Sequence, residues 1–248
     1  MINVNGLHKF KQFFENYDTN YIVIGGTACQ VIFDEIGLTF RSTKDIDIVL
    51  IIENLNELFA KTLWDFIKEA NYEIEYAMDK KCFYRFKNPK NAEYPKMIEL
   101  FSRKQTSKLL EDVHIIPIHI ADEISSLSAI LLNDDYYQFL MKGKRIINGI
   151  SVLDERYIIP FKVKAWCELV ERRLKGEQGQ LKHIKKHCRD IFLILKILPD
   201  EEKIELSGMV KQDMRYFVES IITSEYVPAD INCIYLSERL KFIYLDEM

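Results

Sequence analysis

The sequence lacks paired cysteines, a long apolar run, internal repeats and low-complexity tracts. The five cysteines are scattered, odd in number and form no C-x-x-C pair, which predicts reduced thiols in a cytoplasmic protein. The N-terminal residues lack the continuous apolar segment of a signal peptide. The longest apolar run, residues 46–52, is interrupted by Asp47 and is far too short to span a bilayer. We therefore expect no membrane role.

The chain also lacks an excess of positive charge. Its 34 Lys and Arg residues are outnumbered by 38 Asp and Glu residues, and the net charge is −4. A protein that coats DNA is normally basic, so this balance argues against such a role. Hydrophobic residues make up 48% of the chain, which is enough to bury a core in one large or two small domains.

The residues from Tyr21 to Leu50 contain the strongest local pattern. Tyr21–Ile24 is an apolar run that predicts a buried strand, and Gly25-Gly26-Thr27 follows it at once. The next residues predict a helix, with Thr27 as its cap. A turn of this kind lets backbone N–H groups approach an anion at the helix N-terminus, although a glycine pair is also common in tight turns.

Two carboxylates open the next predicted strand, which spans residues 46–52. Asp45 and Asp47 are two residues apart, so on a strand they point to one face, where they repel each other unless a cation lies between them. Mg²⁺ suits such oxygen ligands. A third carboxylate, Glu99, lies 52 residues after Asp47 in a predicted strand over 94–101. A charge inside an apolar strand is costly unless it is paired, coordinating or facing water.

The remaining pattern predicts an α/β (α+β) fold with a mixed sheet, flanking helices and a C-terminal helical bundle. An Asn148-Gly149 pair between apolar runs predicts a β-hairpin. We place a domain boundary near Ile158, which gives domains 1–158 and 159–248. The other predicted strands are 71–77, 81–86 and 113–120, and the predicted helices are 7–17, 54–70, 122–132, 161–175, 181–198, 201–209, 212–223 and 230–245.

The series Gly25-Gly26-Thr27 followed by Arg41-x-Thr43-x-Asp45-Ile46-Asp47 resembles the nucleotidyltransferase superfamily signature, in the form seen in the AbiEii-type toxin branch. The resemblance implies that Gly25, Gly26 and Thr27 hold the triphosphate of an NTP. It implies that Asp45, Asp47 and Glu99 hold two Mg²⁺ ions, although the family more often has Asp at the third position. The implied reaction transfers a nucleoside monophosphate to an acceptor hydroxyl and releases pyrophosphate.

The resemblance extends into the C-terminal region, to about residue 195. AbiEii-type proteins carry a lysine early in the first helix after the sheet domain, then a basic residue and an aspartate on the next helix. Lys162 is the better match for the lysine and Lys164 is the alternative; about 200° separates them on a helix, so they cannot both face one point. Lys186 and Asp190 match the second helix. A lysine beside the triphosphate offsets developing charge.

Several roles stay open at this point. Asp190 is predicted either to orient the lysine, to act as general base on the acceptor, or to pair with Arg189 or Lys186. Arg41 or Lys44 is predicted to neutralise phosphates, or else to be a solvated loop charge.

The acceptor is also open. The AbiEii branch is associated with toxin–antitoxin and phage-defence systems, which implies RNA or tRNA as acceptor and a cognate antitoxin as partner. A rival hypothesis is a small-molecule nucleotidyltransferase of the aminoglycoside-modifying kind, which needs an acidic acceptor pocket; Glu123, Asp134 and Asp135 are candidates for its lining. A third hypothesis is a nucleotide- or partner-binding module that kept the fold and lost turnover.

Overall fold

The computed structural model describes residues 6–74, 85–103 and 133–246. These residues form two compact units. The sheet unit contains the described residues up to 103 together with 142–154, and the helical unit contains 133–141 and 155–246. The mixed α/β fold class predicted from the sequence is confirmed. The predicted strand 113–120 and helix 122–132, including Glu123, lie outside the described residues.

The sheet unit is built on one mixed sheet. β1 lies next to β2 in antiparallel orientation and next to β7 in parallel orientation, and β2 pairs with β5 in parallel. All four residues of β1 and of β7 are buried, as expected for central strands covered on both faces. Within the described residues the strand order is β3 (Glu73–Ile74), β4 (Arg85–Lys87), β5 (Met97–Ser102), β2 (Asp45–Leu50), β1 (Tyr21–Ile24), β7 (Ile150–Leu153) and β6 (Lys144–Ile147).

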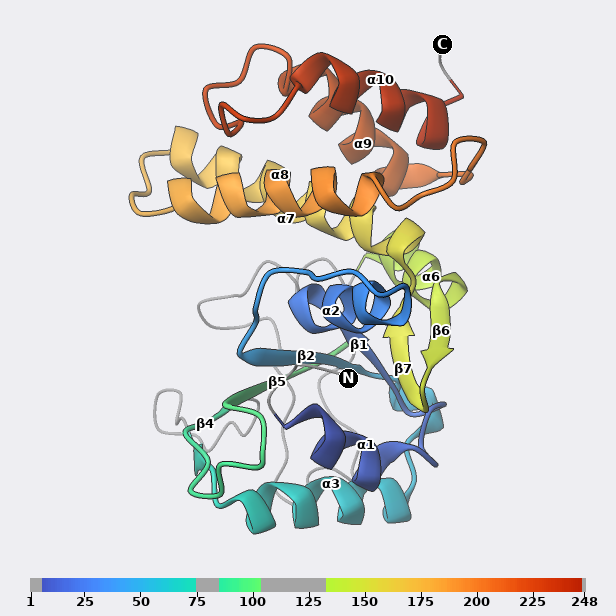
Figure 1. Ribbon diagram of the computed structural model, residues 1–248, viewed down its shortest axis with the longest axis vertical. Coiled ribbons are helices and arrows are strands. Elements are labelled where there is room, and N and C mark those ends of the chain that lie inside the picture. The colour runs from blue at the N-terminus through green and yellow to red at the C-terminus, as the bar shows by residue number, and fades with distance from the viewer. Residues whose placement is uncertain (1–5, 75–84, 104–132, 247–248) are drawn as a thin grey trace. The chain divides into compact units, whose positions relative to one another are not determined.

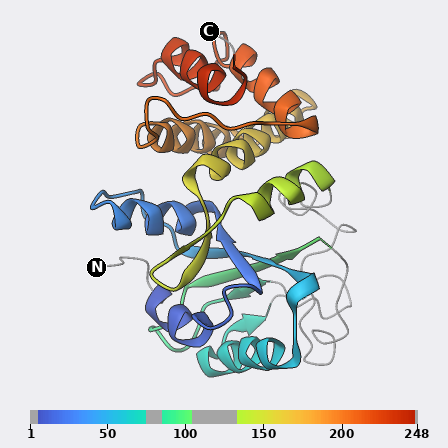
Figure 2. The same cartoon turned by 90° about the vertical axis from the view of Figure 1, so that its right-hand side faces the viewer.

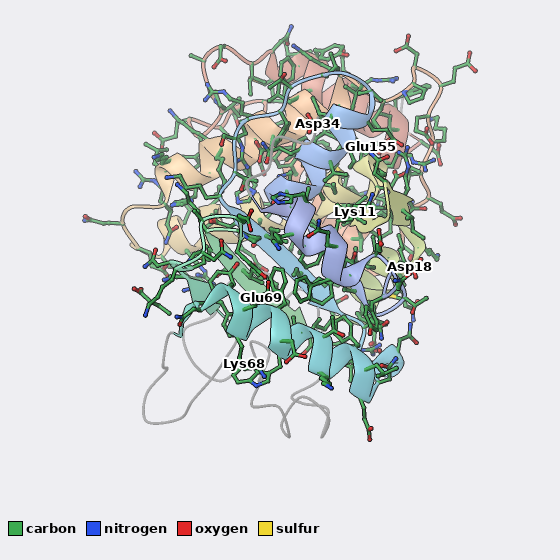
Figure 3. The ribbon with its side chains drawn as sticks, turned by 60° about the horizontal axis from the view of Figure 1, so that its bottom comes forward. Lys11, Asp18, Asp34, Lys68, Glu69 and Glu155 are labelled. Carbon is green, nitrogen blue, oxygen red and sulfur yellow. The ribbon has the colours of Figure 1, made fainter. Side chains whose placement is uncertain are left out.

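Helices cover both faces of this sheet. Helix α2 (Gly25–Glu35) lies on one face, while α1 (Leu7–Phe14) and α3 (Glu57–Ala70) lie on the other (Figures 1 and 2). The rings of Phe14 and Phe66 join α1 to α3, with centroids 5.3 Å apart. Lys68 lies on the outer side of α3, where its side chain is 56% exposed (Figure 3). The apolar face of each helix therefore packs inward and its charges face water.

The predicted β-hairpin is confirmed. β6 and β7 are antiparallel, and the two residues between them, Asn148 and Gly149, have φ values of 49° and 77°. Two successive positive φ angles are the requirement of a type I′ turn, which Asn-Gly meets at little steric cost.

The helical unit consists of five helices among the described residues. Helix α7 packs against both α8 and α9, and α9 packs against α10. At the centre, the rings of Trp166 and Phe217 meet edge to face with centroids 4.9 Å apart. None of the described helices is both long and apolar enough to cross a membrane. The helices are α6 (Asp134–Lys142), α7 (Glu155–Leu174), α8 (Leu181–Leu195), α9 (Gly208–Ser220) and α10 (Cys233–Tyr244).

Helix α7 begins earlier than the predicted start at Phe161 and contains Pro160 in its interior. Proline has no N–H group, so the carbonyl of Arg156, four residues earlier, loses its partner within the helix. The hydroxyl of Tyr244 on α10 donates a hydrogen bond to this carbonyl at 2.6 Å. A hydrogen bond from a helix distant in sequence therefore replaces the one that the proline removes. Sequence rules alone place a helix boundary at such a proline.

The predicted helix over 201–209 is wrong. Residues 202–207 have no regular secondary structure, and Ile204 N donates to Ile243 O at 2.9 Å instead of to a helical partner. Helix α9 begins at Gly208, and the Asp135 carboxylate from α6 accepts a hydrogen bond from Met209 N at 2.8 Å. A carboxylate from another helix thus satisfies a backbone donor in the first turn of α9.

Candidate metal and nucleotide site

The structure brings the three predicted carboxylates together on the sheet. β2 and β5 run parallel with Asp47 opposite Glu99 and Asp45 opposite Met97. Side chains of register partners share a face, and side chains two residues apart on a strand do so as well. Asp45, Asp47 and Glu99 therefore lie on the same face of two neighbouring strands. All three are partly exposed.

Gly25 links the glycine turn to these carboxylates. Helix α2 begins at Gly25, directly after β1, and the last residue of β1, Ile24, is the register partner of Asp47. Gly25 has a φ of +67°, and a β-carbon on it would overlap Oδ2 of Asp47. Glycine is required here for two reasons, because the backbone is left-handed and the carboxylate lies against it.

The next two residues of the turn, Gly26 and Thr27, contact Thr43, just before β2, and Asp45, at its start. A β-carbon on Gly26 would lie 3.0 Å from Oγ1 of Thr43. Thr27 is fully buried, and its hydroxyl donates to the carbonyl of Asp45 at 2.6 Å. Thr27 lies inside α2, so the prediction that it caps this helix is wrong; its side chain instead fixes α2 to the start of β2. The N-cap residue of α2 is Ile24, which makes no side-chain capping bond.

Glu99 is paired with an arginine that the sequence reasoning missed. Arg85 on β4 is the antiparallel register partner of Glu99, and its Nε donates to Oε1 of Glu99. The two side chains are 30% and 14% exposed. The available signal was a basic residue in the strand predicted at 81–86. The register that places it beside Glu99 is not readable from the sequence.

The chemistry of the donor set fits a hard divalent cation. Carboxylate oxygens are the ligands that Mg²⁺ takes, and the strands place three of them on one face. As the side chains lie, no three His, Cys, Asp or Glu residues among those described are arranged to hold a metal ion. Glu99 is directed to Arg85 instead. Asp45 and Asp47 therefore stay predicted ligands, and Glu99 is bonded to Arg85 in this structure.

Arg41 and Lys44 lie in the irregular segment between α2 and β2. The guanidinium of Arg41 lies 5.4 Å from the ring centroid of Phe40, and Lys44 is exposed. Their assignment to phosphate stays a prediction.

In the helical unit, Lys162 and Asp190 form a buried ion pair between α7 and α8. Lys162 Nζ lies 2.8 Å from Asp190 Oδ2, and the side chains are only 6% and 0% exposed. Lys186 lies one turn before Asp190 on α8 and is partly exposed. Arg189 instead pairs with Asp230 at the surface, at 2.8 Å. Asp190 is therefore paired with Lys162.

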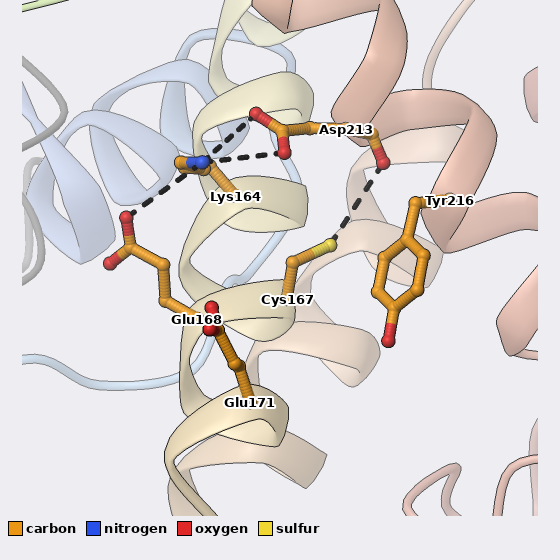
Figure 4. Close-up of a pocket in the computed structure, with 6 residues that line it drawn as sticks. All are labelled: Lys164, Cys167, Glu168, Glu171, Asp213 and Tyr216. Carbon is orange, nitrogen blue, oxygen red and sulfur yellow. Dashed lines mark hydrogen bonds and ion pairs between the residues drawn. The ribbon is translucent and has the colours of Figure 1, made fainter.

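Lys164 faces a different environment, a pocket of about 310 Å³ between α7 and α9. Its Nζ lies 3.1 and 3.3 Å from the two carboxylate oxygens of Asp213, which also accepts a hydrogen bond from the Tyr136 hydroxyl at 2.9 Å. The separation of Lys162 from Lys164 follows from their spacing on one helix. The pocket is lined by Lys164, Cys167, Glu168, Glu171, Asp213 and Tyr216 (Figure 4).

The pocket carries an excess of negative charge, with three carboxylates against one lysine in its lining. Burial raises the pKa of Glu168 to about 7, and the opposing attraction of Lys164 and Arg172 is smaller. Burial also raises the pKa of the Cys167 thiol well above its ordinary value. These acidic residues were missed by the sequence reasoning, because their convergence requires α9.

Asp134 and Asp135, the candidates for an acidic lining, lie in the first turn of α6 and do not line this pocket. Asp135 serves the N-terminus of α9 instead. Cys29, Cys167, Cys188 and Cys233 are free thiols among the described residues.

Comparison with known proteins finds no matching family model, no similar curated protein and no similar solved structure.

Proposed function

We propose that this chain is a Mg²⁺-dependent nucleotidyltransferase that moves a nucleoside monophosphate from an NTP to an acceptor hydroxyl. The observation that carries the proposal is the register of Asp47 with Glu99, with Gly25 pressed against the Asp47 carboxylate. A glycine turn at a helix N-terminus and a carboxylate group are the two parts needed to hold a triphosphate and its metal. The closeness of Gly25 to the Asp47 carboxylate supports the proposal that the two parts act together.

Each part of the site has a chemical role in this proposal. Asp45 and Asp47, joined by Glu99 when it leaves Arg85, would hold the cation, which would supply positive charge to the phosphates and to the acceptor oxygen. The backbone N–H groups at Gly25 and Gly26 receive phosphate oxygens. The acceptor oxygen forms a bond to the α-phosphorus, the bond from this phosphorus to the bridging oxygen breaks, and pyrophosphate leaves. A carboxylate of the site takes the hydroxyl proton.

In the proposal, Asp190 orients the side chain of Lys162. Full burial of Asp190 against Lys162 favours the orienting role over proton transfer to an acceptor from solution. That Lys162 offsets charge at the triphosphate stays a prediction of the resemblance. The same holds for Lys186 as the basic residue of the next helix.

A second candidate is transfer to a small molecule rather than to RNA, and the acidic pocket of the helical unit supports only the binding of such a molecule. Three carboxylates around a volume of about 310 Å³ suit an amine-bearing small molecule. RNA, with its phosphate backbone, does not suit that surface. Association with an antitoxin stays a prediction of the resemblance.

The test is incubation of the protein with each α-labelled NTP, Mg²⁺ and either total RNA or a panel of amine-bearing small molecules. We expect label in one acceptor class, reduced at least ~100-fold by Asp45→Asn/Asp47→Asn. The matched control is Asp65→Asn, because Asp65 is a surface carboxylate on α3 that is 46% exposed. This variant should leave transfer unchanged.

The remaining outcomes separate the hypotheses. Mg²⁺-dependent NTP binding without transfer to either class would support the non-catalytic module. Neither binding nor transfer would overturn the metal-site proposal.

A further inference from the structure

The carboxylate site includes a built-in cation. Arg85, Glu99 and Asp47 follow one another across β4, β5 and β2 as successive register partners. Arg85 Nε donates directly to Glu99 Oε1, in a position where Glu99 is only 14% exposed. A guanidinium on a largely buried carboxylate is held more firmly than a surface ion pair, since water screens it less.

The guanidinium of Arg85 carries a charge of +1 and lies against Glu99, where a second divalent ion would have to bind. A second ion on Glu99 would lie within a few ångströms of the guanidinium, and a charge of +1 repels a charge of +2 strongly at such a distance.

We propose that Arg85 takes the place of a second metal ion, so that the nucleotide-free protein binds a single divalent cation on Asp45 and Asp47. This inference rests on the proposed metal site, and it departs from the two ions that the resemblance implies. Arg85 is a positioning residue in this arrangement: it holds Glu99 and excludes a competing cation from it. A second ion enters only when another anion draws Arg85 away from Glu99.

The experiment counts bound metal ions without reference to activity. The full chain, free of nucleotide, is titrated with Mn²⁺, and free aqueous Mn²⁺ is followed by electron paramagnetic resonance. The wild type should bind one ion. Arg85→Gln should bind two ions, or bind its ion about tenfold more tightly, because the repelling charge is gone. Arg85→Lys keeps the charge and should bind one ion with wild-type affinity.

Two further variants control for folding and for location. Arg85→Gln leaves Glu99 without its arginine, so Arg85→Gln/Glu99→Gln removes both charges and should bind one ion, as the wild type does. Asp45→Asn/Asp47→Asn should bind none. Thermal unfolding of every variant identifies any loss of metal that comes from loss of the fold.

Each outcome has a distinct meaning. Two ions on the wild type, or identical titrations for the wild type and a folded Arg85→Gln, would overturn the inference and leave the proposed metal site intact. Absence of Mn²⁺ binding from both the wild type and folded Arg85→Gln would overturn the inference and the proposed metal site together.

Discussion

The Cα of Gly25 lies so close to Oδ2 of Asp47 that the space where a β-carbon would sit is already filled by the carboxylate. Gly25 at the start of α2 and Asp47 on β2 are therefore in close contact. In the proposed site, the Asp47 carboxylate and the start of α2 are direct neighbours. This contact explains why a glycine, and not merely a turn-forming residue, stands at the end of β1.

The first prediction concerns Gly25→Ala. We expect it to weaken Mn²⁺ binding by about tenfold or more, because the new methyl group displaces Asp47, and to cost about 1–2 kcal/mol of stability from the left-handed backbone. Gly37→Ala is the matched control, since Gly37 has a φ of +73° but nothing within 4 Å of its β-carbon position. It should lose similar stability in urea unfolding and keep its Mn²⁺ affinity. Equal Mn²⁺ affinities for the two variants would contradict the prediction.

The second prediction concerns the Lys162–Asp190 pair. Asp190→Asn leaves a buried lysine charge without its carboxylate, which should lower the free energy of unfolding by about 3–5 kcal/mol. Lys162→Met/Asp190→Leu removes both charges and should recover most of that loss. If the pair also serves the reaction, nucleotidyl transfer stays lost in this restored double variant, whereas recovery of transfer would make the pair purely structural.

A neighbouring ion pair provides the control. Arg189 and Asp230 are 51% and 68% exposed, and Asp230→Asn should change stability by at most about 1 kcal/mol. Denaturant unfolding of both aspartate variants under one condition makes the comparison direct.

The third prediction is a pH dependence set by Glu168. Burial raises its pKa from 4.5 to about 7, so the folded protein holds a proton that the unfolded chain releases. The stabilisation is fully present below pH 4.5 and is lost as pH rises from 4.5 to about 7. Glu168→Gln cannot ionise and should be more stable than the wild type at pH 8, by about 1 kcal/mol after screening by water.

Thermal unfolding of the wild type and Glu168→Gln between pH 4.5 and pH 8 measures this effect. The two stability curves should diverge as the pH rises. Parallel curves would show that the Glu168 carboxyl titrates alike in the folded and unfolded chains. Glu171→Gln, on the same helix but with a side chain that is 64% exposed, should follow the wild type.

The fourth prediction concerns the hydrogen bond from the Tyr244 hydroxyl to the carbonyl of Arg156. Tyr244→Phe removes the hydroxyl that satisfies Arg156 O, and Tyr244 is only 2% exposed, so water cannot easily replace it. The loss of stability should be about 1–3 kcal/mol in urea unfolding. Tyr235→Phe, where the ring is 44% exposed on the same helix, should change stability by less than about 0.5 kcal/mol. A similar loss in both variants would assign the effect to the helix rather than to this hydrogen bond.

Local signals in the sequence predicted much of the sheet unit. The apolar run Tyr21–Ile24 is a strand with those bounds, and Asn148-Gly149 makes the hairpin turn. The two-residue period places Asp45 and Asp47 on one face. These features depend on residues close in sequence, where side-chain alternation and backbone preference decide the outcome.

The missed features depend on residues far apart in the chain. Arg85 meets Glu99 only through the register of two short strands, and Tyr136 meets Asp213 across 77 residues. The Arg156 carbonyl in the first turn of α7 accepts a hydrogen bond from Tyr244, which is 88 residues away. No local propensity contains this information, because each partner is supplied by tertiary packing.

The chain passes between its two compact units three times, since α6 belongs to the helical unit while the following hairpin belongs to the sheet unit. A fragment that begins at Glu155 therefore lacks the Asp135 carboxylate that serves α9 and the Tyr136 hydroxyl that reaches Asp213. No single cut in the polypeptide separates the two units intact. In evolutionary terms, neither unit can be exchanged by one recombination event: a donor segment must replace two stretches of this chain at once, or bring its own substitute for α6.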